Sequence, residues 1–224
     1  MSNKIRLTIM DDHQSIVDGY LYRLSGFPEI EVIATLAYGD ELEHTLKEQP
    51  VNVLLLDVQV PTSPKNSNPY PILHTIPKLL EEYPDLAILV ISMHDERSLI
   101  RAIVEAGASG YILKNDRQRI QELGKAIISV GEGGVCFSEK ALKAFLTKKE
   151  EPFTARELEA LSLSAAYPNS KTAELARKMK IANSTLRNLL SSVYLKLDVH
   201  TRAAAIAKAR QMGIIASDSV AIQL

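Results

Sequence analysis

Short apolar runs alternate with amphipathic stretches from residue 4 to residue 130. The run that ends in Leu54-Leu55-Leu56 has no period-two alternation, which favours a strand buried on both faces of a parallel sheet. Five strand–helix units in series predict an α/β fold, a doubly wound, five-stranded parallel sheet with helices on both faces. The predicted strands are 5–10, 31–36, 51–56, 86–91 and 109–113, and the predicted helices are 14–24, 39–48, 75–82, 96–105 and 117–130. Pro77 is expected in the first turn of its helix, where proline is tolerated.

After residue 130 the pattern contains helices only. A short helix is predicted at 138–146, and the charged run before Pro152 predicts a flexible linker at about 147–152. A capping box, Thr154 with Glu157, begins a further helix, and others are predicted at 171–179, 183–197 and 202–212. The short turn before the third of these four helices predicts a helix-turn-helix, although a small helical bundle without a ligand fits the same pattern. The chain therefore divides into 1–130, a linker with a short helix at 131–152, and an all-α domain at 153–224.

Composition narrows the class of protein. The 224 residues contain no apolar run near the roughly 20 residues of a membrane span, and the N-terminus lacks a signal-peptide pattern, so a cytoplasmic protein without a membrane partner is expected. The single cysteine, Cys136, excludes an internal disulfide, argues against a zinc site and is expected to be a small buried residue. Residues 1–130 carry 12 basic against 18 acidic side chains, whereas residues 149–224 carry 11 against 7. The first part therefore suits a divalent cation and the second nucleic acid.

Acidic residues follow two of the predicted strands. Asp57 ends the third strand, and Asp11 and Asp12 end the first. Because the carboxyl ends of parallel strands share one edge of the sheet, these carboxylates are expected to lie together, and a Mg²⁺ ion would relieve their repulsion. Ser92 and Lys114 end the fourth and fifth strands, which brings a hydroxyl and a cation to the same edge. Phosphoryl transfer to a carboxylate requires this set, although each residue alone also fits a helix cap, a turn or a solvated strand end.

These positions resemble the receiver domain of bacterial two-component response regulators, which has a flavodoxin-like fold. The resemblance lies in Asp11-Asp12, in residues 56–61, in Ser92 and in residues 110–114. It implies that Asp57 accepts the phosphoryl group. It also implies that Asp12, Asp57 and the main-chain carbonyl of Gln59 hold Mg²⁺ with support from Asp11.

The same resemblance assigns four further residues. Lys114 would contact the phosphoryl group, and Ser92 would turn toward it after transfer. Tyr111 matches the aromatic residue that rotates inward with that hydroxyl, although a sheet-edge aromatic fits the same position. Gln59 and His94 fall where the family tunes dephosphorylation. A metal-ligand role for His94 is less favoured because Mg²⁺ prefers oxygen.

One segment departs from the receiver pattern. Residues 62–71 contain three prolines and replace a shorter, Gly-containing loop directly after the phosphoacceptor segment. The prolines predict an extended, poorly helical loop. It would shield Asp57 or alter recognition by a kinase, or it is a tolerated surface insertion.

The C-terminal part resembles the LuxR-type helix-turn-helix of NarL/FixJ-like regulators. The matching residues are Glu174, Leu175, Ala176, Met179, Ile181, Thr185, Leu186, Arg187, Val193, Lys196, Leu197, Val199 and Arg202. Departures are Ala182 in place of a capping serine, Leu189 in place of a histidine, and a longer turn at 167–169. The alanine-rich face of the last helix would, by this resemblance, pair with its twin in a homodimer.

Candidate DNA contacts lie on the predicted helix 183–197, off its apolar stripe. Arg187 suits guanine and Asn188 suits adenine, and Ser191 lies beside them. Thr185 and Lys196 are better placed for phosphates, which contribute affinity without sequence information. A solvated polar face fits the same positions.

The leading hypothesis is a response regulator and not a turnover enzyme. A sensor histidine kinase would phosphorylate Asp57, and the C-terminal domain would then dimerise on double-stranded DNA, with RNA polymerase as a further partner. The alternative is a phosphorylation-independent regulator whose receiver-like domain serves dimerisation or partner binding, which the long loop favours. A phosphoester hydrolase is a third hypothesis, but that class needs an Asp two residues after the nucleophile, where this chain has Gln59.

Overall fold

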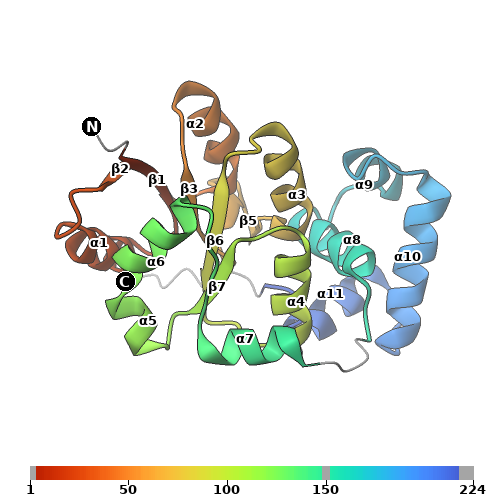
Figure 1. The fold of residues 1–224 in the computed structure, drawn as a ribbon. Helices are drawn as coiled ribbons and strands as arrows, with labels where there is room; N and C mark the ends of the chain where they lie inside the picture. The colour runs from red at the N-terminus through yellow and green to blue at the C-terminus, as the bar shows by residue number, and fades with distance from the viewer. Residues whose placement is uncertain (1–3, 148–151, 217–224) are drawn as a thin grey trace.

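The structure is a computed structural model that describes residues 4–147 and 152–216 (Figure 1). Within these residues, six parallel strands form one sheet in the order β2-β1-β3-β6-β7-β8. The strands are β1 (Ile5–Met10), β2 (Ile30–Leu36), β3 (Val53–Asp57), β6 (Ala87–Ser92), β7 (Gly110–Leu113) and β8 (Cys136–Phe137). Because the strand order reverses at β1, this strand lies beside β3, with Met10 opposite Leu56. The doubly wound parallel sheet predicted from the sequence is confirmed.

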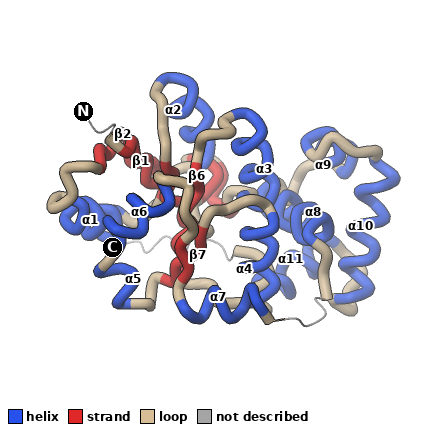
Figure 2. Tube along the Cα trace, viewed as in Figure 1, coloured by secondary structure: helices blue, strands red, loops and turns tan. Residues whose placement is uncertain are grey.

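Helices cover both faces of the sheet, as Figure 2 shows. The helices of the first part of the chain are α1 (Gln14–Leu24), α2 (Leu42–Glu48) after a 3₁₀ turn at Gly39–Glu41, α3 (Ile72–Glu82), α4 (Arg97–Glu105), α5 (Arg117–Gln121), α6 (Leu123–Gly131) and α7 (Glu139–Leu146). Buried residues of α1 and α6 share one apolar core with one face of the sheet, and those of α2, α3 and α4 share a second core with the other face. The predicted helix 117–130 is interrupted at Glu122, which lies outside helical geometry.

A sixth strand extends the sheet beyond the five predicted strands. The main-chain amides of Cys136 and Ser138 donate hydrogen bonds to the carbonyl oxygens of Ser109 and Tyr111, at 3.2 and 3.0 Å. A Cβ atom on Gly110 would lie 2.1 Å from the carbonyl oxygen of Cys136, so β8 approaches β7 only because residue 110 is glycine. Cys136 is buried, as predicted.

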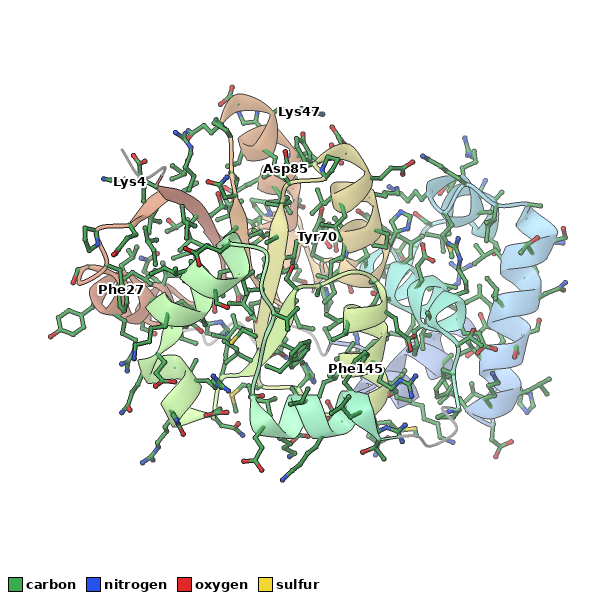
Figure 3. All side chains as sticks on the ribbon, viewed as in Figure 1. Lys4, Phe27, Lys47, Tyr70, Asp85 and Phe145 are labelled. Atoms are coloured by element: carbon green, nitrogen blue, oxygen red, sulfur yellow. The ribbon has the colours of Figure 1, made fainter. Side chains whose placement is uncertain are left out.

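The proline-rich segment after β3 forms an antiparallel hairpin of β4 (Pro61–Ser63) and β5 (Asn66–Pro69). Tyr70 follows the hairpin and packs against Gly39; it is labelled in Figure 3. Helix α3 then begins at Ile72, earlier than predicted, because the carbonyl oxygen of Pro71 accepts the first amides of the helix. Pro77 consequently lies inside α3 and not in its first turn, so the sequence-based placement of Pro77 was wrong. The helix tolerates Pro77 at the cost of one main-chain hydrogen bond.

The C-terminal part consists of helices only, as predicted, and lies beside α3 and α4 (Figure 1). Its helices are α8 (Ala155–Ala166), α9 (Thr172–Lys178), α10 (Asn183–Lys196) and α11 (Arg202–Gln211). Buried residues of α8 and α11, such as Leu161 and Ile206, belong to the same apolar core as Ile76 and Ile103 of α3 and α4. The linker predicted at 147–152 falls mostly outside the described residues. Among the residues that are described, no helix combines the length and the apolar character needed to span a membrane.

Candidate functional site

Three of the predicted site residues meet at the carboxyl edge of the sheet. Asp11 directly follows β1, Asp57 ends β3, and Lys114 directly follows β7. The Lys114 Nζ atom lies 2.8 Å from Asp11 Oδ2 and 2.9 Å from Asp57 Oδ2. Asp11 and Asp57 are 3% and 2% exposed, respectively. The adjacency of β1 and β3 therefore brings two buried carboxylates onto one ammonium group.

Burial dominates the electrostatics of Asp57. It raises the pKa of this carboxyl, and nearby Asp11 raises it further, while Lys114 opposes both effects. Burial alone would lower the pKa of Lys114, but the two carboxylates outweigh it, so the pKa of Lys114 is raised. Lys114 is therefore a fixed cation at this edge of the sheet.

The acidic edge offers a set of ligand atoms for a metal ion. One side-chain ligand atom each from Asp11, Asp12, His13 and Asp57 lies within 4.8 Å of the others. Asp57 Oδ1 is buried. The main-chain amide of Gln59 lies near the Asp57 carboxyl and lowers its pKa, in opposition to the effect of burial. A hard cation such as Mg²⁺ fits this oxygen-rich site.

Ser92, His94 and Tyr111 form a second group beside the acidic edge. The Ser92 hydroxyl oxygen accepts a hydrogen bond from the His94 amide at 3.1 Å, and the Tyr111 hydroxyl donates to the His94 carbonyl oxygen at 2.7 Å. Tyr111 is fully buried, which raises its pKa. Because β8 pairs with β7, Tyr111 is not an aromatic on the outer strand of the sheet. Its inward position makes it part of the core between the sheet and α4.

The predicted DNA-contact residues lie on α10. This helix buries Leu186, Leu190 and Val193, which form its apolar stripe. Thr185, Arg187, Asn188 and Ser191 are all exposed, and Ser191 lies one helical turn after Arg187 and Asn188. These side chains are accessible in the described arrangement of the two parts of the chain.

Lys196 differs from the other predicted contacts because it has an acidic partner. Its Nζ atom lies 2.8 and 2.7 Å from the two carboxylate oxygens of Glu157, which is 4% exposed. Burial would raise the pKa of Glu157, but hydrogen bonds from Lys196 and Ser192 lower it to about 2. The Thr154–Glu157 capping box is confirmed as well, so Glu157 joins the start of α8 to the end of α10.

Comparison with known proteins identifies the first part of the chain. Residues 7–125 match the response regulator receiver domain family. The chain belongs to the response regulator family. The receiver match contains Asp11, Asp12, Asp57, Ser92 and Lys114, and the acidic cluster at its edge is typical of a receiver metal site.

Relatives of this response regulator extend over both parts of the chain. The transcriptional regulatory protein MctR of Rhizobium johnstonii is 31% identical and covers 95% of this chain and 96% of its own length. DegU of Brevibacillus brevis is 28% identical, covering 94% of this chain and 95% of its own. A structure of RcsB from Salmonella enterica serovar Typhimurium bound to a promoter has a TM-score of 0.66 at 18% identity and covers 93% of this chain and all of that one, which supports the fold. The protein is a two-component transcriptional regulator and not a turnover enzyme.

Two features of this response regulator escaped the sequence-based prediction. His13 lies at the acidic edge, with its Nδ1 atom 2.9 Å from Asp12 Oδ1. Its position directly after two acidic residues was the available signal. The second feature is the partnership of Lys196 with Glu157 across 39 residues, for which the sequence gives no local signal.

Proposed function

We propose that this response regulator accepts a phosphoryl group on Asp57 from a sensor histidine kinase and that phosphorylation controls its binding to DNA. The observation that carries the proposal is the pairing of Lys114 with Asp57 and Asp11 at a buried sheet edge. A carboxylate nucleophile beside a fixed cation is the arrangement that phosphoryl transfer to Asp requires, because the cation stabilises the transferred oxygens.

The cofactor in this proposal is Mg²⁺. Asp12, Asp57 and the main-chain carbonyl of Gln59 would hold it, with Asp11 as a supporting carboxylate. When bound, the ion would neutralise charge on the phosphoryl oxygens. The oxygen-rich ligand set and the burial of Asp57 support this assignment.

The residues around the phosphoacceptor have distinct proposed roles. Lys114 contacts the phosphoryl group through the ammonium that pairs with Asp57. Ser92 and Tyr111 form the switch, which their shared contact with the His94 main chain supports. Gln59 and His94 tune dephosphorylation by controlling access of water to the acyl phosphate.

The proposed partner of the C-terminal part, residues 153–224, is double-stranded DNA. Arg187, Asn188 and Ser191 would contact bases, and Thr185 and Lys196 would contact phosphates. The pairing of Lys196 with Glu157 reduces the positive charge that Lys196 offers to a phosphate. We therefore expect Lys196 to contribute less to DNA affinity than Thr185 does. We further infer that the protein forms a homodimer through α11. We also infer that it is cytoplasmic and meets its kinase and RNA polymerase in the cytoplasm.

The phosphoacceptor assignment is tested with a small phosphodonor and Mg²⁺. The intact mass of the wild-type chain is expected to rise by one phosphoryl group, and peptide mapping is expected to find it on Asp57. Asp57→Asn should remain unmodified because it lacks the nucleophile. Asp85→Asn is the matched control, since Asp85 is exposed at the opposite end of β6 and is labelled in Figure 3; it should be modified like the wild type. A phosphoryl group on another residue, or on Asp57→Asn, would contradict the assignment.

A further inference from the structure

The β4–β5 hairpin connects directly to the phosphoacceptor loop. It begins at Pro61, two residues after Gln59, and is closed by a hydrogen bond from the Tyr70 amide to the Val60 carbonyl oxygen at 2.8 Å. Within the hairpin, the Thr62 hydroxyl donates to the Asn68 carbonyl oxygen at 2.8 Å. Asn66 Oδ1 accepts from the Asn68 side-chain amide at 2.7 Å. The hairpin is therefore an ordered element and not a loose insertion.

The tip of the hairpin contacts the C-terminal end of α8. Asn66 Nδ2 donates a 2.9 Å hydrogen bond to the carbonyl oxygen of Ala166, the last residue of that helix. The last carbonyls of a helix lack donors within the helix and need partners from elsewhere. The receiver thus supplies a C-terminal cap to a helix of the DNA-binding part. The two segments that meet here, residues 62–71 and the turn after α8, are both segments in which the sequence departs from its family patterns.

Other contacts hold the C-terminal part against the receiver on the same side. His74 Nδ1 lies 2.9 Å from Glu159 Oε1 in a nearly buried pair between α3 and α8. Lys78 Nζ donates to the carbonyl oxygen of Lys178 at 3.2 Å. The shared apolar core lies beneath these contacts. The predicted DNA-contact residues of α10 nevertheless remain exposed, so this docking orients the reading helix and does not cover it.

We propose that the β4–β5 hairpin is an interdomain clasp in which Asn66 is the positioning residue. By capping α8 from the receiver, it fixes the orientation of the helix-turn-helix relative to the phosphoacceptor loop. Phosphorylation of Asp57 then alters the clasp through Val60, the one residue that separates Gln59 from the hairpin. This last step rests on the proposed function, whereas the clasp itself does not.

Asn66→Asp separates the clasp from the fold of the hairpin. The aspartate retains Oδ1, which accepts the bonds within the hairpin, but replaces the donor to Ala166 with a carboxylate oxygen. Amide hydrogen exchange at Tyr167 and Ser170, in the turn after α8, is expected to be about fivefold faster than in the wild-type chain, which corresponds to the loss of one net hydrogen bond. Ser67→Ala, at the exposed adjacent position, should leave these amides unchanged. Equal exchange in Asn66→Asp and wild type would overturn the clasp.

A second arm adds phosphodonor and Mg²⁺ to the full-length chain and follows the mass and the exchange together. In the phosphorylated wild type, exchange in residues 61–69 and in the turn 167–170 is expected to change together. In Asn66→Asp the change in the hairpin should persist, while the response of the turn should be lost. If the wild-type chain is fully phosphorylated and amide exchange in the turn 167–170 does not change, the proposed coupling between Asp57 and the clasp is contradicted. If the mass of the chain does not change, the proposed function is contradicted instead. The clasp is still tested in that case, by the difference in exchange between unphosphorylated Asn66→Asp and unphosphorylated wild type.

Discussion

Replacing Lys114 with methionine is expected to slow phosphorylation of Asp57 by about 10²-fold, the usual effect of removing one preorganised charge from a transferred oxygen. The same change should lower the free energy of unfolding by about 3 kcal/mol in the absence of divalent cations. It leaves Asp11 and Asp57 buried without their shared partner, and breaking a buried ion pair from one side has effects of this size. Phosphodonor kinetics by intact mass and urea unfolding measure the two effects.

A titration with Mg²⁺ distinguishes this cause from general damage to the fold. Because the cation supplies positive charge at the same carboxylates, it should recover part of the lost stability in Lys114→Met, more than it adds to the wild type. Lys125→Met is the matched control, since Lys125 is exposed on α6 and away from the acidic edge. Lys125→Met should phosphorylate at the wild-type rate. A Lys114→Met chain that phosphorylates as fast as this control would refute the role of Lys114.

The acidic edge was predictable because its residues end predicted strands. Asp11, Asp57 and Lys114 each mark the carboxyl end of an apolar run, and parallel strands bring such ends together whatever the details of packing. The identity of the neighbouring strands was not needed to place these residues at one edge. The local rule and the global topology agree at this site.

Elements held by distant partners were not predictable in the same way. Strand β8 has only two residues, and it exists because Gly110 leaves room for Cys136. The hairpin at 61–69 has no alternating pattern of β-branched residues, and its pairing depends on side-chain hydrogen bonds such as that of Thr62. The contact of Asn66 with Ala166 joins residues 100 positions apart. Local propensity contains no information about such partners.

Arg187→Ala is expected to weaken binding to the preferred DNA sequence by about 1–3 kcal/mol, or about 5- to 150-fold in affinity. Arg187 is exposed on the first half of α10, where its guanidinium can form two hydrogen bonds with one guanine. The variant should also relax sequence preference at one position of the site. Selection of binding sites from random DNA, followed by titration at fixed salt concentration, measures both effects.

Arg177→Ala provides the comparison for Arg187→Ala. Arg177 is also an exposed arginine, but it lies on α9, off the reading helix. Its replacement removes the same charge, so it should weaken specific and nonspecific binding by the same small factor and reduce the salt dependence slightly. If Arg187→Ala also weakens specific and nonspecific binding by the same factor, Arg187 contacts the phosphate backbone. That result would contradict its role in reading bases.

The control of DNA binding by phosphorylation is tested most directly by the affinity of the full-length chain for its selected DNA site, measured with and without phosphodonor in the presence of Mg²⁺. Phosphorylation of the wild type is expected to increase this affinity by about tenfold, within the usual range of coupling between two sites. Asp57→Asn should show no response. Equal affinities for fully phosphorylated and unphosphorylated wild-type protein would contradict the account and favour a regulator that acts independently of phosphorylation.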